Sequence, residues 1–201
     1  MMRVIGLTGS IAMGKTTAAK AFSEIGIPVF DSDATVHRLY SAGGAGSKAI
    51  SALVPQAIQS DAVDRQVLAR AIAETPGLLA QIEGAIHPLV RSAQEAFIAD
   101  ARNAGADLAV LDIPLLFETG RDKDVDIIIV VSAPVEIQRA RAMARPGMTE
   151  EKLTSLLERQ TPDAEKRRRA DFIVNSSGTP DDAARQVREI VAQLRRNHDH
   201  A

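Results

Sequence analysis

The chain has 201 residues, of which 45% are hydrophobic and 25% charged, proportions ordinary for a globular protein. Its length suits one domain with a modest insertion. The formal net charge of −2 excludes a general attraction to nucleic acid or anionic membranes, and the absence of cysteine excludes disulfides and thiolate chemistry. No apolar stretch is long enough for a membrane-spanning helix. We expect a cytoplasmic protein without nucleic acid, membrane or obligatory protein partners.

Short apolar runs along the chain predict five strands, at residues 4–7, 27–30, 108–113, 125–131 and 172–174. The longer runs show no alternation of apolar and polar residues, which is typical of parallel strands buried on both faces. Segments with helical periodicity separate the runs. Residues 15–25, for example, place Ala18, Phe22 and Ile25 on one side of a helix. This order predicts an α/β fold, with a parallel five-stranded sheet flanked by helices.

Two helical stretches do not belong to a minimal sheet domain. Residues 37–104 hold no convincing strand, and Pro88 predicts a helix boundary within them. Residues 139–170 are helical and rich in arginine. We interpret the first stretch as a helical insertion and the second as a lid. The remainder is the predicted core: residues 1–36, 105–138 and 171–201. A last helix is expected after Thr179, which can cap it, with Pro180 in its first turn.

A phosphate-binding motif follows the first predicted strand. Residues 9–16, Gly-Ser-Ile-Ala-Met-Gly-Lys-Thr, match G-x-x-x-x-G-K-[ST] at every fixed position. Gly9 and Gly14 let the backbone turn tightly and aim N–H groups at phosphate oxygens. Lys15 supplies a cation, and the Thr16 hydroxyl is a magnesium ligand. The alternative is a glycine-rich turn with an incidental lysine, which the strand before the motif and the helix after it disfavour. The predicted ATP-binding residues here are Gly9, Ser10, Ile11, Ala12, Met13, Gly14, Lys15, Thr16 and Thr17.

Other features favour a small kinase among P-loop proteins. The chain lacks the guanine-reading N-K-x-D segment of regulatory GTPases, and 201 residues leave little room for motor machinery. Asp31 and Asp33 lie two residues apart at the end of a predicted strand, which places both carboxylates on one side of the chain at the ligand crevice. Either carboxylate could accept the proton of an acceptor hydroxyl, or Asp31 caps the helix that begins near Ala34. Asp112 ends another strand, where it either holds magnesium through water or caps a turn.

The arginine-rich lid supplies candidate cations for phosphoryl transfer. Arg141 and Arg145 are four residues apart and would share a helix face. In a closing lid they would meet the charge that develops on the transferred phosphoryl group. We interpret residues 166–169, four consecutive cations, as a solvated helix surface. His87 lies inside the insertion, next to Pro88, and a lone histidine is more often structural than a ligand.

Several segments, in their order along the chain, together resemble the dephospho-CoA kinase family. They are residues 4–16, 29–33 (V-F-D-S-D), 64–68, 86–88 (I-H-P), 113–118 (I-P-L-L-F-E), 141–145 (R-A-M-A-R), 160 and 170–175. The P-loop alone specifies only a superfamily, whereas the ordered set is specific and covers nearly the whole chain. The chain departs from the family in the P-loop interior, S-I-A-M where G-I-G-S is usual, and in Pro146 where aspartate is usual.

The resemblance implies transfer of the γ-phosphoryl group of ATP, with Mg²⁺, to the ribose 3′-hydroxyl of dephospho-CoA. It implies that residues 37–104 bind this acceptor. The implied catalytic residues are Lys15, Asp33 and Arg141. Arg141 and Asn175 join the ATP-binding set, and Thr16 and Asp112, the latter through water, form the metal site. The implied acceptor-binding residues are Asp31, Asp33, Arg65, His87, Leu116 and Arg145. The alternatives are another P-loop nucleotide or nucleoside kinase and a non-catalytic ATP-binding regulator.

Overall fold

The computed structural model describes residues 1–198, and contacts within it divide the chain into two units. One unit holds Met1–Phe30 together with the chain from Ala101 onward, and the other holds Asp31–Asp100. The first unit therefore contains the phosphate-binding motif and the arginine-rich stretch, and the second contains most of the predicted insertion. Residues 199–201, the end of the predicted core, lie outside the described part of the chain.

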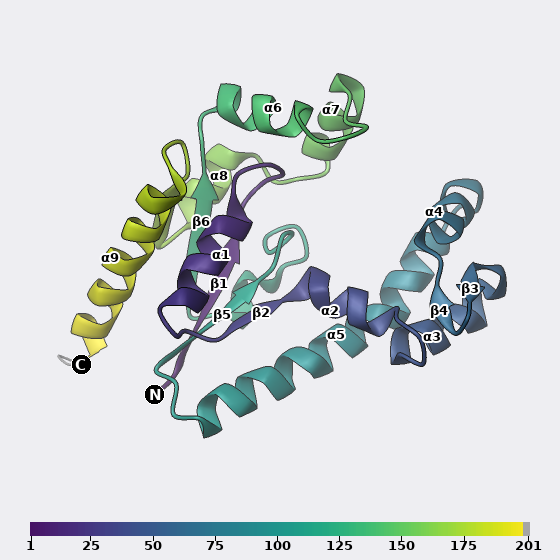
Figure 1. Cartoon of the computed structure of the whole chain (residues 1–201), viewed down its shortest axis with the longest axis horizontal. Coiled ribbons are helices and arrows are strands. Elements are labelled where there is room, and N and C mark those ends of the chain that lie inside the picture. The colour runs from purple at the N-terminus through teal and green to yellow at the C-terminus, as the bar shows by residue number, and fades with distance from the viewer. Residues whose placement is uncertain (199–201) are drawn as a thin grey trace. The chain divides into compact units, whose positions relative to one another are not determined.

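The first unit is built on a five-stranded sheet in the order β2-β5-β1-β6-β7 (Figure 1). The strands are β1 Arg3–Thr8, β2 Val29–Asp31, β5 Leu108–Asp112, β6 Ile127–Ser132 and β7 Phe172–Asn175. β1 pairs in parallel with both β5 and β6, and β6 pairs in parallel with β7. At the edge next to β2, Val110 N donates to Pro28 O at 2.9 Å. The predicted α/β sheet and its five strands are confirmed.

The sheet is buried on both faces, which explains why its strands show no polar alternation. Among the fully buried side chains are Ile5, Leu7, Val110 and Ile129. β1 lies in the middle, and the chain continues to strands on either side of it. In open α/β sheets such a switch point creates a ligand crevice at the carboxyl ends of the strands. Leu7 lies beside Asp112 in the register of β1 and β5, so the phosphate-binding motif and Asp112 belong to the same edge of the sheet.

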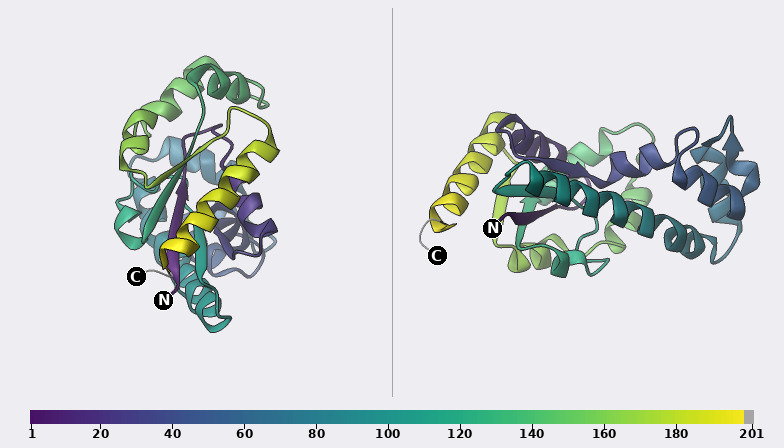
Figure 2. Two further views of the ribbon diagram at one scale, coloured as in Figure 1. Left: turned by 90° about the vertical axis from the view of Figure 1, so that its left-hand side faces the viewer. Right: turned by 90° about the horizontal axis from the view of Figure 1, so that it is seen from below.

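Helices cover this sheet and its carboxyl edge. They are α1 Lys15–Glu24, the 3-10 helix η2 Arg121–Asp124, α6 Val135–Met143, α7 Glu150–Glu158, α8 Asp163–Arg169 and α9 Pro180–His198. α1 and α9 pack side by side (Figure 2), and α8 packs against β6. α6 and α7 lie beyond the carboxyl ends of the strands (Figure 1). α9 begins as predicted, because Thr179 Oγ1 accepts a hydrogen bond from Asp182 N at 3.2 Å. Within residues 1–198, no helix combines the length and apolar character needed to cross a membrane.

The second unit is mainly helical. Its elements are α2 Ser32–Leu39, α3 Ala45–Leu53, the 3-10 helix η1 Pro55–Ala57, β3 Ile58–Gln59, β4 Ala62–Val63, α4 Arg65–Glu74 and most of α5 Leu78–Asn103. The antiparallel β3–β4 hairpin corrects the expectation that this stretch holds no strand. Its turn residues, Ser60 and Asp61, have φ values of 48° and 61°, as a type I′ turn requires, but without the glycine that usually signals one.

α5 also differs from the prediction, because it continues through Pro88 instead of ending there. A proline inside a helix costs about 3 kcal/mol, since it removes a hydrogen bond and crowds the preceding turn. Ile82, Ile86 and Val90 lie around it at helical spacing, and all three are buried. Burying an aliphatic side chain contributes about 1.5–3 kcal/mol, so the packing of this face outweighs the penalty.

Candidate active site

The phosphate loop, residues 9–14, joins β1 to α1 in a conformation that requires glycine at its two ends. A Cβ atom at Gly9 would lie 2.6 Å from the carbonyl oxygen of Val131 in β6, so any side chain there would clash with the sheet. Gly14 has a φ of 81°, in the left-handed region that glycine favours. Ala12 has a φ of 62° although it is not glycine. Ala12 is buried, 6% exposed, and packs with Ala142 and Leu153.

Lys15 and Asp112 form an ion pair at the start of α1. Lys15 is the first residue of α1, and Asp112 is the last residue of β5. Their side chains are only 17% and 8% exposed. Thr16, the next residue of α1, is exposed. The first turn of α1, at the positive end of its dipole, thus carries an ammonium and a hydroxyl group, and the end of β5 adds a carboxylate. This combination suits the binding of phosphate and a divalent cation.

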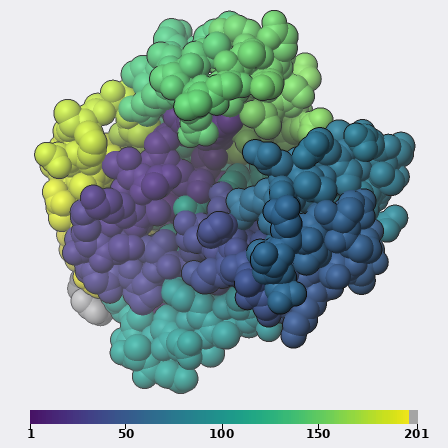
Figure 3. All heavy atoms as spheres, turned by 45° about the vertical axis from the view of Figure 1, so that its right-hand side comes forward, coloured from purple at the N-terminus to yellow at the C-terminus, as the bar shows by residue number. Residues whose placement is uncertain are grey.

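Two glutamines bind the backbone of Ile11 in the phosphate loop. Gln138 of α6 donates from Nε2 to Ile11 O at 2.9 Å, and Gln160, which follows α7, accepts through Oε1 from Ile11 N at 3.1 Å. Ile11 and Ala12 also belong to a small apolar cluster with lid side chains, namely Ala142, Met148, Leu153 and Leu157. α6 and α7 therefore pack directly on the phosphate loop. In Figure 3 the green atoms of this stretch lie against purple atoms of the N-terminal segment. The sequence analysis did not predict the two hydrogen bonds to Ile11, because Gln138 and Gln160 lie about 130–150 residues from it and no local pattern links them.

A buried ion pair lies next to the segment that carries Gln160. Lys166 in α8 is fully buried and pairs with Glu118 at 2.9 Å, which corrects the interpretation of this residue as part of a solvated surface. Residues 167–169 are exposed, as expected. Glu118 Oε1 also accepts from Thr161 N at 2.7 Å, so the carboxylate fixes the segment that carries Gln160. Burial raises the pKa of Glu118, but the Lys166 ammonium and the peptide N–H groups outweigh it, so this pKa lies below its ordinary value. The burial arises because α8 packs one face on β6.

A pocket of about 300 Å³ lies beside the phosphate loop. Its lining includes Gly14, Thr17, Arg141, Arg145, Ser176, Gly178 and Thr179. Arg141 is fixed by Ser176, since its Nη1 donates to Ser176 Oγ at 3.1 Å and its Nη2 donates to Ser176 O at 2.6 Å. The expectation that Arg141 and Arg145 share a helix face was wrong. α6 ends at Met143, because Pro146 cannot continue a helical hydrogen-bond ladder. Both arginines nevertheless line the same pocket.

Asn175, predicted to belong to the ATP-binding set, comes one residue before the pocket lining. Its Oδ1 accepts from Ser177 N at 2.9 Å, so the side chain closes a turn in the loop between β7 and α9. Its neighbour Ser176 lines the pocket and donates from Oγ to Met13 O at 2.7 Å. Ser176 therefore joins this loop to the phosphate loop. Asn175 stabilises the turn of the loop through its hydrogen bond with Ser177.

The two aspartates that follow β2 have different surroundings. Asp31 caps α2, because its Oδ1 accepts from Ala34 N at 2.8 Å; the capping alternative for this residue is confirmed. Asp33 lies in the first turn of α2 and is exposed. The carboxylate of Asp33 is therefore available to a ligand, whereas that of Asp31 already has a structural role.

The other predicted acceptor-binding residues are scattered. The Arg65 guanidinium lies 5.8 Å from the centre of the Tyr40 ring, within cation–π range. Burial raises the pKa of Tyr40, and the charge of Arg65 partly opposes the shift. His87 is exposed on α5. Leu116 does not suit a ligand contact, because its side chain is fully buried, whereas the adjacent Leu115 is 41% exposed.

The fold and this site together define a class of protein. The phosphate loop follows the central strand of a parallel sheet, Lys15 pairs with Asp112, and two arginines line the pocket beside the loop. These are the parts of a P-loop kinase that acts on small molecules. The chain belongs to the dephospho-CoA kinase family, because residues 3–182 match the model of that family.

Comparisons with individual proteins agree with this assignment. The chain is 51% identical over 193 residues to a dephospho-CoA kinase of Brucella melitensis, a match that covers 96% of each protein. It is 53% identical over 194 residues to that of Agrobacterium fabrum, covering 96% of this chain and 99% of the relative. Among solved structures, TT1252 from Thermus thermophilus matches with a TM-score of 0.80 and 33% identity, covering 96% of this chain and 98% of that one. A shikimate kinase of Bacteroides thetaiotaomicron shares the fold alone, with a TM-score of 0.55 and 14% identity over 97% of this chain and 99% of that one.

Proposed function

We propose that the chain phosphorylates the ribose 3′-hydroxyl of dephospho-CoA with ATP, giving coenzyme A and ADP, the last step of coenzyme A synthesis. The observation that carries this proposal is the family match over residues 3–182. In the reaction, the 3′-oxygen forms a bond to the γ-phosphorus while the bond from that phosphorus to the β,γ-bridging oxygen breaks. The hydroxyl proton passes to a base, and ADP leaves with the bridging oxygen.

The donor side of the reaction is assigned to the first unit. The backbone N–H groups of residues 9–16 and the Lys15 ammonium would hold the β- and γ-phosphates. The pocket beside Gly14 and Ser176 would take the nucleoside part of ATP. Arg141 and Arg145 line that pocket, so we assign them to the negative charge of the phosphates and of the transferred group. The lid is assigned to residues 139–170.

Magnesium is the metal we propose for this site. The Thr16 hydroxyl and the Asp112 carboxylate are oxygen ligands of the kind Mg²⁺ prefers, and Asp112 would act through a water molecule. The donor set fits, because both residues belong to the carboxyl edge of the sheet, where Asp112 is the last residue of β5 and Thr16 is in the first turn of α1. The ion would neutralise charge on the β- and γ-phosphate oxygens.

The acceptor side is assigned to residues 37–104 together with the segment that follows β2. We propose Asp33 as the base that accepts the 3′-hydroxyl proton, since it is exposed in the first turn of α2, whereas Asp31 is engaged as a cap. Arg65 and His87 are exposed polar groups on α4 and α5 suited to the phosphates and hydroxyls of the acceptor. From the P-L-L-F-E segment, Leu115 replaces Leu116 as the side chain able to contact it.

The direct test is ADP release from MgATP with dephospho-CoA, AMP, CMP or no acceptor. Strong stimulation by dephospho-CoA alone, with a product phosphorylated at the 3′ position, is the expected result. Stimulation by another acceptor would retain the kinase chemistry but replace the substrate. If ATP binds and no acceptor stimulates ADP release, the chain is an ATP-binding regulator and the proposed activity is wrong.

A further inference from the structure

The loop between β7 and α9 supplies one wall of the pocket beside the phosphate loop. Ser176, Gly178 and Thr179 line this wall, together with Pro180 and Ala183 at the start of α9. These side chains are small, so a base against this wall would meet loop backbone as well as the Ser176 and Thr179 hydroxyls. The N–H groups of Ser176, Ser177 and Thr179 are already bonded within the protein, so the backbone groups left to a ligand are those of Gly178 and the Ser177 carbonyl. A purine can be distinguished by such groups only if they stay in place, because adenine presents an amino donor where guanine presents a carbonyl acceptor. The position of this loop therefore bears on which nucleotide binds.

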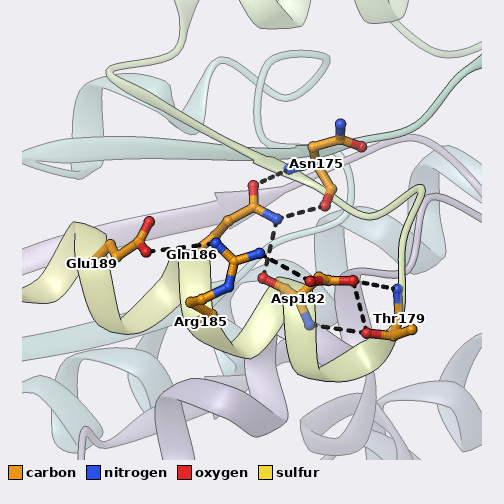
Figure 4. Close-up of polar contacts among 6 residues, drawn as sticks. All are labelled: Asn175, Thr179, Asp182, Arg185, Gln186 and Glu189. Atoms are coloured by element: carbon orange, nitrogen blue, oxygen red, sulfur yellow. Dashed lines mark hydrogen bonds and ion pairs between the residues drawn. The ribbon is translucent and has the colours of Figure 1, made fainter.

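Gln186 of α9 binds both backbone polar groups of Asn175, the last residue of β7 (Figure 4). Its Nε2 donates to Asn175 O at 2.8 Å, and its Oε1 accepts from Asn175 N at 2.9 Å. β7 is an edge strand of the sheet, and the next residue, Ser176, directs its N–H to Ser132 in β6. The N–H and C=O groups of Asn175 therefore point away from β6. The Gln186 amide takes the place of a neighbouring strand, since it offers one donor and one acceptor.

The other end of the loop is fixed from the same helix, one turn earlier. Asp182 Oδ2 accepts from Thr179 N at 3.0 Å and from Thr179 Oγ1 at 2.8 Å, while Asp182 N donates to Thr179 Oγ1 at 3.2 Å (Figure 4). A Cβ atom at Gly178 would lie 2.7 Å from Asp182 Oδ2, so the carboxylate occupies the space of a side chain there. Gln186 and Asp182 are four residues apart and share a helix face. Together they hold the loop at both ends.

We propose that Gln186 is a positioning residue for the nucleotide: by holding Asn175, it sets the backbone of residues 176–179 and thereby the affinity for ATP and the preference for ATP over GTP. Gln186 does not line the pocket itself, so it acts through the loop. The proposal rests on the proposed function, in which ATP is the phosphoryl donor and this pocket takes its base.

The test compares wild type, Gln186→Leu and the control Arg188→Ala. Gln186→Leu keeps the side-chain volume but removes both hydrogen bonds to Asn175, together with the one of 3.2 Å from Nε2 to Asp182 O. Arg188 is exposed on the same helix and does not line the pocket. With saturating dephospho-CoA, Gln186→Leu should raise the KM for ATP about ten-fold, the effect of losing two hydrogen bonds, with kcat within about two-fold. Its preference for ATP over GTP in kcat/KM should fall by a similar factor. Arg188→Ala should leave both quantities unchanged.

Gln186→Glu supplies a readout that a merely structural role would not move. As a carboxylate it can accept from Asn175 N but repels Asn175 O, whereas the protonated acid, like the amide, both donates and accepts. Relative to wild type at each pH, its KM for ATP should fall towards the wild-type value between about pH 6 and about pH 4, because the acid form grows around the ordinary glutamic acid pKa of about 4.3. The same ratio for Gln186→Leu should not change with pH.

The proposal is overturned if Gln186→Leu keeps the wild-type KM for ATP and the wild-type nucleotide preference. It is also overturned if the KM for dephospho-CoA and kcat change as much as the KM for ATP, because this would indicate general loss of structure. If Gln186→Leu does not fold, the pH profile of Gln186→Glu decides alone. Failure of the proposed function is distinguishable, because the wild-type chain would then show no ADP release with dephospho-CoA.

Discussion

The two units differ in how far their predicted functional residues already contact one another. In the first unit, Lys15 pairs with Asp112, and Arg141 binds Ser176 through two hydrogen bonds. In the second, Asp33 and His87 are exposed on α2 and α5. The nucleotide side is thus prearranged by internal contacts, whereas the acceptor side presents groups to solvent. Substitutions on the nucleotide side should therefore change binding together with chemistry, and those on the acceptor side should change chemistry with little effect on ATP.

The largest expected effect is that of Asp33→Asn. Loss of a general base lowers kcat by about 10²–10⁴-fold. The dissociation constant of ATP should stay within about two-fold, because the proposed role of Asp33 is towards the acceptor hydroxyl and not towards the phosphates of ATP. Asp31→Asn is the matched control, since asparagine also caps helices well, and its kcat should remain within a few-fold of wild type. Steady-state rates and ATP binding by calorimetry check both variants. Near-wild-type turnover in Asp33→Asn would remove this residue from the mechanism.

Lys15→Ala should lower kcat by about 10²–10³-fold, the loss expected for one preorganised charge donor, and should weaken ATP binding as well. This variant tests the first unit, where the losses of kcat and of ATP affinity should appear together. Lys20→Ala, on the same helix, removes only the exposed ion pair with Glu24 and should change neither quantity. Unchanged ATP affinity in Lys15→Ala would contradict the assignment of the phosphate loop.

Lys166→Met should destabilise the protein without removing any group that touches a ligand. Removal of one partner from a buried ion pair costs about 3–5 kcal/mol, because the other charge is left uncompensated. The lower end is expected, since Glu118 is 13% exposed. Arg167→Met, at an exposed position of the same helix, should shift the free energy of unfolding by no more than about 0.5 kcal/mol. Urea unfolding measures both variants. Adding Glu118→Gln to Lys166→Met should recover part of the loss, and a further loss instead would show that the pair is not the cause.

The smallest effect concerns the cap that holds the loop before α9. Hydrogen bonds from Arg185 and Thr179 lower the pKa of Asp182 to about 2, from the model-peptide value of 3.8. Because the folded pKa is the lower of the two, the stabilisation is complete above pH 3.8 and is lost as the pH falls towards 2. The urea midpoint of wild type should therefore fall more steeply with acid over this range than that of Asp182→Asn. Parallel slopes would mean that the carboxylate contributes nothing through its charge.

Local sequence patterns were sufficient for elements formed by neighbouring residues. The five strands follow from unalternated apolar runs, α1 from helical periodicity and α9 from its cap at Thr179. Predictions from local patterns were wrong where tertiary packing outweighed the local preference of a residue. Pro88 lies inside α5 because buried residues on either side hold the helix together. Arg145 lies beyond α6, yet the fold returns it to the pocket that Arg141 lines.

The sequence by itself determined the sheet, the phosphate loop with Lys15 and Thr16, and the family, because each depends on the order and spacing of nearby residues. Only the tertiary structure decided that Lys166 is a buried partner of Glu118, that Gln138 and Gln160 bind Ile11, and that Gln186 holds Asn175. These contacts join polar residues from separate elements, up to about 150 positions apart. A lysine or glutamine has the same local pattern on a solvated surface as in a buried pair, so its role depends on which elements the fold packs around it.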